Sequence, residues 1–286
     1  MAFGTHIRTF FEGRWHEGDI PVLRAADHGI WQGSSVFDGA RWFEGVTPDL
    51  DRHAARLNHS AEAMLITPLL TGEEIAAIAQ EGLHAYARDE AVYVRPMYWA
   101  LDGDRLGVAP NPDSTAFCLC LEAVPMPGPE VTTRLTLSSF RRPVLADAVC
   151  NAKAGALYPN NARMLREAQA RGYGNAVSLD ALGNVAETAT ANLFIVKDGV
   201  LRTPIANGTF LSGITRARHI ANARAAGIPV EEAVLTPRDL HEADEVFLSG
   251  NFAKVTGVSE FDGTLYRSSA ITARMRQLYW DWAHSA

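Results

Sequence analysis

The sequence is poor in lysine, because its 286 residues include only three lysines against 23 arginines. An exposed position accepts either cation, so a lysine kept in an arginine-rich chain suggests chemistry that a guanidinium group cannot do. Lys153 lies in the run NAKAGALYPNNARM, among small and apolar residues. A buried amine can lose its proton and act as a nucleophile, whereas arginine stays protonated. Lys153 is therefore the first candidate catalytic residue.

Cysteine, long apolar runs and blocks of like charge are scarce as well. Cys118, Cys120 and Cys150 lie in apolar stretches, which predicts reduced thiols in a cytoplasmic protein. Cys118 and Cys120 are expected to share the buried face of a strand, so no metal site is predicted. No stretch reaches the length of a membrane span, and residues 1–15 lack the apolar core of a signal peptide. A net charge of -7 without runs of like charge argues against a nucleic-acid or membrane partner.

Length and composition predict two domains, because a chain of 286 residues with 47% apolar residues can bury two modest cores. The segment PMPGPE, residues 125–130, is the most linker-like part of the chain. We therefore expect a smaller N-terminal domain over residues 1–124 and a larger C-terminal domain over residues 131–286. Short strands and helices mix in both parts without a repeat of fixed period. This pattern predicts an α+β fold in which antiparallel pairing is favoured over parallel pairing.

Local patterns place most of the elements. Helical periodicity predicts a helix over residues 50–64, and Thr71 followed by Glu74 forms a capping box that starts a second helix. Pairs of an acidic residue and a glycine predict tight hairpin turns. These pairs are Glu12-Gly13, Glu44-Gly45 and Asp198-Gly199. A further hairpin is expected over 175–188, other strands at 91–101, 114–124, 132–140 and 244–251, and other helices at 158–172, 214–227 and 236–243.

Several other residues would complement Lys153 in a pyridoxal phosphate enzyme. Such an enzyme needs a carboxylate for the pyridine nitrogen and backbone N–H groups for the phosphate. Glu187 lies among small and apolar residues, which is an unusual place for a carboxylate without a partner. Tyr158 follows Lys153 at about one helical turn, and Ser212-Gly213 precedes a helix whose first N–H groups could bind phosphate. None of these signals is specific alone.

Together, four segments form a recognisable pattern: NAKAGALY, GNVAETATANLFIVKDGVLRTP, FLSGITR and DEVFLSG. In their order and spacing, the chain resembles the fold-type IV pyridoxal-phosphate aminotransferases from about His6 to Tyr266. This class holds branched-chain aminotransferases, D-amino-acid transaminases, (R)-selective amine transaminases and aminodeoxychorismate lyase. The resemblance implies a small N-terminal α/β domain and a larger C-terminal domain with a pseudo-barrel. It also implies pyridoxal 5'-phosphate as the cofactor and a homodimer or higher homo-oligomer.

The resemblance implies a role for each matching residue. Lys153 binds the cofactor covalently and moves a proton, Tyr158 hydrogen-bonds the phenolic oxygen of the cofactor, and Glu187 pairs with its pyridine nitrogen. The implied reaction is a ping-pong transfer of an amino group to a 2-oxo acid such as 2-oxoglutarate or pyruvate. The residues implied to hold the phosphate or to contact the ring are Arg56, Leu211, Gly213, Ile214, Thr215, Gly250 and Asn251.

The substrate-side residues resemble those of branched-chain aminotransferases. They imply a donor with a hydrophobic, branched-chain-like side chain. The matching positions lie in a Phe-x-Gly-x-Arg run, a Tyr-x-Arg pair and the loop that follows the pair. They are Phe37, Gly39, Arg41, Tyr93, Arg95 and Val108.

Four residues leave alternatives open. Gln32 replaces a residue that is usually aromatic, Asn251 replaces the usual threonine, and Phe252 replaces a small residue in the turn that receives the substrate carboxylate. Arg105 is similar in kind to a basic residue of the D-amino-acid enzymes. The alternatives are a D-amino-acid or (R)-selective amine transaminase and a lyase of the aminodeoxychorismate type. A non-enzymatic small-molecule-binding protein is a further alternative, which would not need Lys153.

Overall fold

The computed structural model describes residues 4–285, which form two compact units. The first unit comprises the chain up to Met126 together with Ala152–Leu157, and the second comprises Pro127–Asn151 together with the chain from Tyr158 onward. Met126, where the first part of the first unit ends, lies in the segment 125–130 that was expected to be a linker. The segment Ala152–Leu157 joins the first unit because Ala154 forms a β-bridge with Val36.

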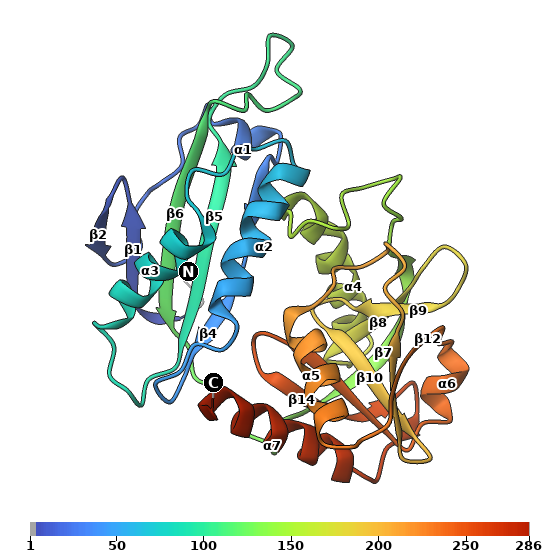
Figure 1. The fold of residues 1–286 in the computed structure, drawn as a ribbon. Helices are drawn as coiled ribbons and strands as arrows, with labels where there is room; N and C mark the ends of the chain where they lie inside the picture. The colour runs from blue at the N-terminus through green and yellow to red at the C-terminus, as the bar shows by residue number, and fades with distance from the viewer. Residues whose placement is uncertain (1–3, 286) are drawn as a thin grey trace. The chain divides into compact units, whose positions relative to one another are not determined.

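The first unit is a six-stranded antiparallel sheet with helices on one face. The order of its main strands is β2-β1-β6-β5-β3, and β4 also pairs with β5. Helices α2 and α3 cover one face of this sheet (Figure 1). The strands are β1 (Thr5–Phe11), β2 (Arg14–Glu17), β3 (Ser35–Phe37), β4 (Ala40–Trp42), β5 (Val92–Ala100) and β6 (Thr115–Ala123). The helices are α1 (His28–Trp31), α2 (Leu50–Ala63), α3 (Gly72–Leu83) and the 3-10 helix η1 (Gly155–Leu157).

Alternation along β5 separates the two faces of this sheet. Val92, Val94 and Tyr98 are fully buried on the face that packs against the helices. Side chains of residues paired across neighbouring strands lie on the same face. The register therefore gathers a set of side chains on the opposite face, which we call the Arg95 face. They are Phe37, Arg41, Tyr93, Arg95, Met97, Cys118, Cys120 and Glu122.

The second unit is built on a nine-stranded mixed sheet. Its main order is β12-β11-β10-β13-β14-β7-β8-β9, and β15 pairs with β14. The pairs β11–β12, β14–β7 and β7–β8 are parallel, and the other pairs are antiparallel, as expected for most of them. Its strands are β7 (Thr132–Arg141), β8 (Asn175–Leu179), β9 (Val185–Thr188), β10 (Asn192–Lys197), β11 (Val200–Pro204), β12 (Val230–Ala233), β13 (Glu245–Gly250), β14 (Lys254–Phe261) and β15 (Thr264–Leu265).

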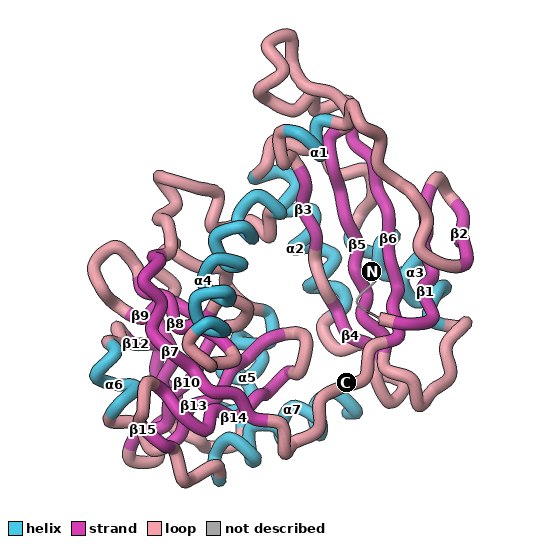
Figure 2. The backbone as a smooth tube through the Cα atoms, turned by 180° about the vertical axis from the view of Figure 1, so that it is seen from behind, coloured by secondary structure: helices cyan, strands magenta, loops and turns pink. Residues whose placement is uncertain are grey.

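This sheet curls on itself and is buried on both faces. Strand β9, at one end of the order, also contacts β10 and β11. Helix α4 packs on β7 and β8 (Figure 2), whereas α5 and α7 pack on β13 and on each other. Alternate residues of β10 consequently belong to two different apolar cores. The predicted α+β fold with a pseudo-barrel is confirmed. The helices of this unit are α4 (Tyr158–Ala170), α5 (Ile214–Ala225), α6 (Pro237–His241) and α7 (Ala270–Ser285).

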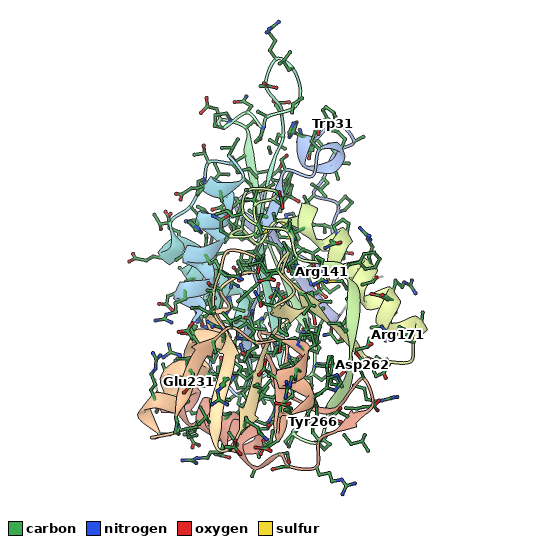
Figure 3. The ribbon with its side chains drawn as sticks, turned by 90° about the vertical axis from the view of Figure 1, so that its right-hand side faces the viewer. Trp31, Arg141, Arg171, Glu231, Asp262 and Tyr266 are labelled. Atoms are coloured by element: carbon green, nitrogen blue, oxygen red, sulfur yellow. The ribbon has the colours of Figure 1, made fainter. Side chains whose placement is uncertain are left out.

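A carboxylate in the β14–β15 turn ties the sheet of the second unit to the end of α4. Asp262 accepts hydrogen bonds from Thr136 Oγ1 at 2.6 Å and from the Leu137 N–H at 2.8 Å. It also lies beside Arg171, with 3.4 Å between the charged groups (Figure 3). The side chain thus satisfies backbone and hydroxyl donors at the edge where strand and helix meet.

Most of the local predictions are confirmed. Hairpins form at Glu12-Gly13 and Asp198-Gly199, with φ of 50° and 77° in the first turn and 50° and 76° in the second. Positive φ at both central residues is the geometry of a type I' turn, which suits the twist of the flanking strands. Thr71 and Glu74 form the predicted capping box at the start of α3.

The prediction of a hairpin around Glu44-Gly45 is wrong. The turn itself forms, but only Phe43 and Val46 bridge across it, and strand β4 pairs with β5. The chain enters helix α2 at Leu50, which leaves too few residues for a second strand. Helix α7 was not predicted at all. Within residues 4–285 no helix is long and apolar enough to cross a membrane.

Candidate active site

The backbone of Lys153 is fixed within the first unit. Its N–H donates to Ser60 Oγ of α2 at 3.0 Å, and its carbonyl accepts from the Phe37 N–H at 3.1 Å. Both backbone polar groups therefore have partners in regular elements. The ammonium group lies 4.7 Å from the centroid of the Phe37 ring, within the range of a cation–π contact. A Cβ at Gly155 would lie 2.8 Å from Ser35 Oγ, so the segment approaches β3 as closely as glycine allows.

A buried carboxylate orients Arg56 in the same unit. Asp38, which follows β3, is fully buried and accepts from Arg56 Nε at 2.7 Å and from Arg56 Nη2 at 2.8 Å. His53, on the same helix as Arg56, approaches it through Nδ1 at 2.7 Å. Burial alone would raise the pKa of Asp38, but Arg56 and His53 hold that pKa well below its usual range. Asp38 thus stays anionic and fixes the plane of the guanidinium group.

Glu187 lies in the second unit, where it is one part of a buried charged cluster. It is on β9 and 8% exposed, and Arg142 Nη2 lies 3.1 Å from its Oε1. Asn192 Nδ2 donates to its other oxygen at 3.2 Å. Arg142 is itself held by donating to Asn161 Oδ1 at 2.7 Å and to the Thr209 carbonyl at 3.2 Å. A buried carboxylate is costly without such partners, so these contacts stabilise Glu187 and hold it in place.

The start of helix α5 is suited to bind an anion. The helix begins at Ile214, and Gly213 before it supplies no side-chain cap. A Cβ at Gly213 would lie 1.9 Å from Asn192 Oδ1, so no larger residue fits there. The first-turn N–H groups of Ile214 and Thr215 therefore meet no cap from Gly213, and the positive end of the helix favours a negative group. Leu211 lies just before, with its carbonyl 3.4 Å from Asn192 Nδ2.

The end of β13 and the turn after it carry two buried polar groups that lack a partner among the described residues. Lys254, which is 1% exposed, donates from Nζ to Asn251 Oδ1 at 2.7 Å. Because lysine only donates, this contact turns the amide nitrogen of Asn251 the other way. Among the described residues, neither Asn251 Nδ2 nor the Ser249 hydroxyl has a hydrogen-bond partner. Buried donors are rarely left unsatisfied, and phosphate oxygens would satisfy both. A Cβ at Gly250 would lie 3.2 Å from Ala191 Cβ.

These observations test whether the residues present suit pyridoxal phosphate. The unsatisfied donors at Asn251 and Ser249, and the helix start at Ile214 that Gly213 does not cap, suit its phosphate group. The buried carboxylate of Glu187 suits a protonated ring nitrogen. Lys153 offers the amine that the cofactor requires. The residues present therefore fit pyridoxal phosphate. Lys153 lies in the first unit, and the other groups named here lie in the second.

The predicted substrate residues differ in environment. Arg41 is fully buried, donates from Nη2 to the Val124 carbonyl at 2.6 Å, and burial lowers its pKa to about 10. A Cβ at Gly39 would lie 2.2 Å from the hydroxyl of Tyr93, so this glycine makes room for the tyrosine. Arg95 is ion-paired with Glu122. Arg41 thus binds the backbone that follows β6.

The remaining predicted residues are more exposed. Tyr158 opens helix α4 and is 36% exposed, and Phe252 is 40% exposed. Arg105 and Val108 lie on the surface loop between β5 and β6, where Asp104 accepts from the Val108 N–H at 3.0 Å. Gln32 is exposed at the end of α1. No group of three or more His, Cys, Asp and Glu side chains in residues 4–285 could hold a metal ion.

Comparison with known proteins decides the family. Residues 35–261 match the family model of amino-transferase class IV. The chain is a class IV aminotransferase. Its relatives include a putative branched-chain-amino-acid aminotransferase from Methanocaldococcus jannaschii, 33% identical over 96% of both chains. A branched-chain-amino-acid aminotransferase from Salmonella typhimurium is 31% identical over 93% of this chain and 88% of the relative.

Solved structures agree with this assignment. An aminotransferase from Brucella abortus, bound to the cofactor PLP, is 54% identical and superposes with a TM-score of 0.96 over 98% of this chain and 99% of that one. The branched-chain amino acid aminotransferase of Escherichia coli is 29% identical, with a TM-score of 0.88 over 98% and 95%. Class IV aminotransferases use pyridoxal phosphate, so the predicted family, enzyme class and cofactor are confirmed. The alternative of a non-enzymatic binding protein is therefore wrong.

The class IV aminotransferase also has residues that the sequence did not single out. They share one property, which is that each helps to hold a predicted site residue in place. Asp38 holds Arg56 and is itself contacted by His53, whereas Arg142 and Asn192 hold Glu187. The only signal for Arg142 was a second arginine in the short run SSFRRPV after a predicted strand. The role of each predicted site residue stays a prediction.

Proposed function

We propose that this class IV aminotransferase moves an amino group between a hydrophobic, branched-chain-like amino acid and a 2-oxo acid. The observation that carries the proposal is the placement of Lys153, whose backbone is held by Ser60 and Phe37 while its amine lies over an aromatic ring. The branched-chain aminotransferases among the relatives support the choice of donor.

Lys153, Glu187 and Tyr158 are the proposed catalytic residues. Bound pyridoxal phosphate supplies an electron sink that makes the α-proton of the donor acidic. Lys153 would hold the cofactor covalently, and its amine, once released by the donor, would carry the proton taken from the α-carbon of the donor. Proton transfer of this kind typically contributes about 10² to 10⁴ in rate. Glu187, paired with Arg142, would keep a proton on the ring nitrogen, and Tyr158 would hydrogen-bond the phenolic oxygen.

The phosphate-binding residues are proposed from both the helix start and the turn. Arg56 supplies a guanidinium group that Asp38 holds in a fixed plane. Ile214 and Thr215 supply N–H groups, and Gly250 and Asn251 complete the site. Charge-assisted hydrogen bonds of this kind are short and roughly twice as strong as neutral ones. Leu211 is proposed to contact the cofactor ring.

A second candidate function comes from the turn Gly250–Phe252. A benzyl side chain, 40% exposed, follows Asn251 where a branched-chain enzyme has a small residue to admit the substrate carboxylate. Such a residue favours a D-amino-acid or (R)-selective amine transaminase, and Arg105 favours the first of these. A lyase of the aminodeoxychorismate type shares the cofactor residues and would release pyruvate.

A donor panel separates these functions. The holoenzyme is mixed in single half-reactions with L-leucine, L-valine, D-alanine and (R)-1-phenylethylamine, and the cofactor absorbance is followed. We expect the second-order rate constants for L-leucine and L-valine to exceed the other two by at least about tenfold. Faster reaction with D-alanine or the amine would replace the first proposal by the second. Pyruvate release from aminodeoxychorismate without an amino acceptor would establish the lyase.

We further propose that the enzyme is a homodimer or higher homo-oligomer of the cytoplasm, acting on small molecules only. The free cysteines support the cytoplasmic location, because burial raises the pKa of Cys118 and Cys120 to about 12 and their thiols stay protonated. Sedimentation analysis of the holoenzyme tests the proposed oligomeric state, and a monomer at micromolar concentration would contradict it.

A further inference from the structure

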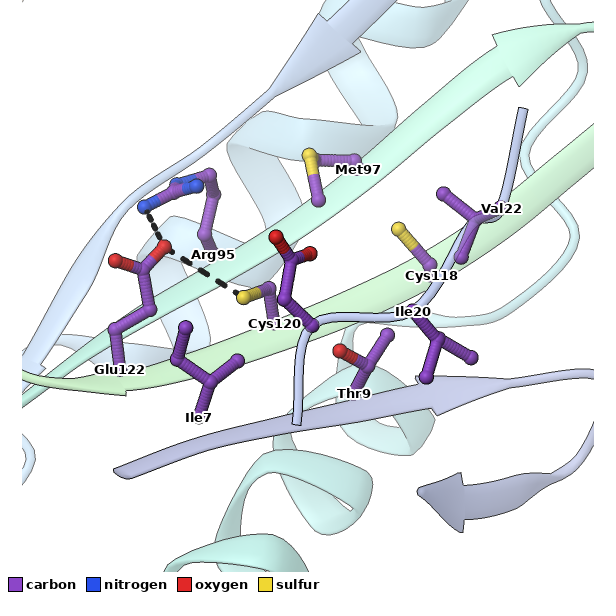
Figure 4. A pocket seen from close by; sticks show the side chains of 10 residues that line it. Ile7, Thr9, Ile20, Val22, Arg95, Met97, Cys118, Cys120 and Glu122 are labelled. Atoms are coloured by element: carbon purple, nitrogen blue, oxygen red, sulfur yellow. Dashed lines mark hydrogen bonds and ion pairs between the residues drawn. The ribbon is translucent and has the colours of Figure 1, made fainter. Parts of the chain in front are cut away.

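A cavity of about 330 Å³ opens on the Arg95 face of the first unit (Figure 4). Its walls come from β1, β5 and β6 and from the segment that follows β2. The lining includes one basic side chain, Arg95, and two acidic ones, Glu122 and Asp19. The other lining residues are Ile7, Thr9, Ile20, Val22, Met97, Cys118 and Cys120. The cavity therefore has both apolar and charged walls. Its two acidic side chains outnumber its one basic side chain.

The single cation of this cavity is bound by a buried carboxylate. Glu122, 3% exposed, forms an ion pair with Arg95, drawn as a dashed line in Figure 4. The other oxygen of Glu122 accepts from the Gly4 N–H at 2.8 Å, and Cys120 Sγ lies 3.6 Å from the paired oxygen. A Cβ at Gly4 would lie 2.6 Å from the Ala123 carbonyl, so this backbone donor is delivered by a close approach. The carboxylate is thus fixed, and it neutralises Arg95.

Strand register connects the cavity to Lys153 within the same unit. The lysine amine lies over the ring of Phe37, and Phe37 pairs with Met97 across β3 and β5. Met97 in turn pairs with Cys118, and both line the cavity. Arg95 is the next residue of β5 on the same face. The Lys153 amine, Phe37, Met97 and Arg95 therefore follow one another along one face of the sheet, and Glu122 lies on that face as well.

We propose that a substrate at Lys153 extends its side chain along this face and that Glu122 sets the substrate class by cancelling the charge of Arg95. A substrate with a carboxylate at the end of its side chain would bring a second anion toward Glu122 and Asp19 without a cation left to pair with it. An unpaired charge in a partly buried site is costly, so such substrates are rejected. The inference rests on the proposed transaminase function and narrows it: the preferred acceptor is a 2-oxo monocarboxylic acid such as pyruvate, and 2-oxoglutarate is disfavoured.

The test is the acceptor preference of Glu122→Gln. Glutamine has nearly the same shape and can still accept from the Gly4 N–H, but it leaves Arg95 with its charge. With one donor, L-leucine, kcat/KM is measured for pyruvate and for 2-oxoglutarate. We expect the wild type to prefer pyruvate and the ratio of 2-oxoglutarate to pyruvate to rise by at least about tenfold in the variant. The matched control is Glu17→Gln, which removes an exposed carboxylate paired with Arg8 and is expected to leave the ratio unchanged.

Several outcomes would overturn the inference. A wild type that prefers 2-oxoglutarate, or a ratio that stays the same in Glu122→Gln, would do so directly. An equal gain for both acceptors would mean that Arg95 binds the carboxylate that all substrates share. If Glu122→Gln does not fold, Asp19→Asn tests the same charge balance, and an unchanged ratio there overturns it.

A binding measurement separates this inference from the transaminase proposal. Glutarate and butyrate, which cannot react, are titrated into the holoenzyme by calorimetry. We expect butyrate to bind wild type and Glu122→Gln alike, and glutarate to bind at least about tenfold more tightly to the variant. This result can appear even if no amino donor is turned over, in which case only the proposed function fails. Equal glutarate affinity in both proteins would overturn the role of Glu122.

Discussion

At the scale of single residues, three polar groups of the candidate site are each held by a buried partner. Asp38 fixes Arg56, Arg142 fixes Glu187, and Lys254 fixes the amide of Asn251. Pairs of this kind add little net stability, because desolvation offsets much of the attraction. Their effect is to leave each group only one orientation, which is what positioning of a reacting centre requires.

Lys153→Ala is expected to abolish turnover while the fold survives. The variant keeps the backbone contacts to Ser60 and Phe37 and loses only the amine. We expect kcat to fall by more than about 10³-fold, because both covalent attachment and proton transfer are lost. Steady-state turnover and the melting temperature are measured together. The control is Lys197→Ala, since Lys197 pairs with Asp244 at the surface, and similar turnover by both variants would contradict the assignment.

Glu187→Gln is expected to slow the half-reaction with an amino donor by about 10² or more, because a neutral amide cannot keep the ring nitrogen protonated. Arg142→Gln should act in the same direction by about tenfold, since Glu187 loses its charged partner. Rapid-mixing absorbance measures both rates. Arg141→Gln is the control, because the neighbouring Arg141 only donates to the Asp180 carbonyl at 3.3 Å. Wild-type rates in Glu187→Gln would make it an ordinary hairpin residue.

Arg56→Ala is expected to weaken pyridoxal phosphate much more than pyridoxal. The loss is one charge-assisted contact to phosphate, worth about 1.5 to 3 kcal/mol. Dissociation constants of both cofactor forms are measured by fluorescence on the apoenzyme. Arg52→Ala on the same helix is the control, because Arg52 is exposed and lies 3.7 Å from Asp49. Equal weakening of the two forms would show that Arg56 does not touch the phosphate.

At the scale of elements, helix α5 is anchored by a buried histidine. His219 is fully buried among the rings of Phe194, Phe247 and Tyr279, and its Nε2 lies 3.1 Å from the Lys254 carbonyl. Burial lowers the pKa of His219 to about 4. The ring is therefore neutral at physiological pH and packs as an aromatic group between the sheet and α7.

This histidine should make stability depend on pH. An unfolded chain takes up a proton on histidine near pH 6.5, whereas folded His219 does so only near pH 4. The unfolded state binds more protons between these values, so stability that is complete above pH 6.5 falls as the pH drops toward 4. We expect a loss of about 2 kcal/mol between pH 7.5 and 5, measured by urea unfolding. His219→Phe should flatten this dependence, and exposed His84→Gln should not. An unchanged slope in His219→Phe would contradict the assignment.

Local sequence patterns predicted the elements whose signals are local. The turn at Asp198-Gly199 and the capping box at Thr71 depend on residues that are neighbours in sequence. Helix α7 escaped prediction because its start is stabilised from elsewhere: Glu245 of β13 accepts from the N–H groups of Ile271 at 3.1 Å and Thr272 at 2.8 Å. A capping group that comes from a distant strand gives no signal in the local sequence of the helix.

The same distinction holds for the site. Lys153 and Glu187 could be predicted because a lysine or a carboxylate among apolar residues is conspicuous by itself. Glu122 and Arg142 could not, because an acidic residue near a strand end and an arginine after a strand are ordinary until the fold brings their partners to them. Resemblance supplied roles for the residues that bind the cofactor, and the structure supplied the residues that hold those in turn.

At the scale of the whole molecule, the cofactor is expected to stabilise the fold by binding the native state only. Ligand at a thousand times its dissociation constant contributes about 4 kcal/mol. For a chain of this size that corresponds to about 7 °C in melting temperature. Calorimetry of apoenzyme and holoenzyme measures the difference, and Arg56→Ala should reduce it. A holoenzyme that melts at the temperature of the apoenzyme would show that the cofactor is not held by the native site.

The segment Ala152–Leu157 has a consequence for biosynthesis. All six strands of the first sheet precede it in the chain, yet it carries the bridge to Val36 and the proposed catalytic residue Lys153. A nascent chain leaves the first unit at Met126, begins the second with β7, and only then returns with Lys153. A ribosome that stalls before Ala152 releases a product that contains every strand of that sheet and lacks Lys153. Such an abortive product therefore lacks the amine proposed to attach pyridoxal phosphate, whatever part of it folds.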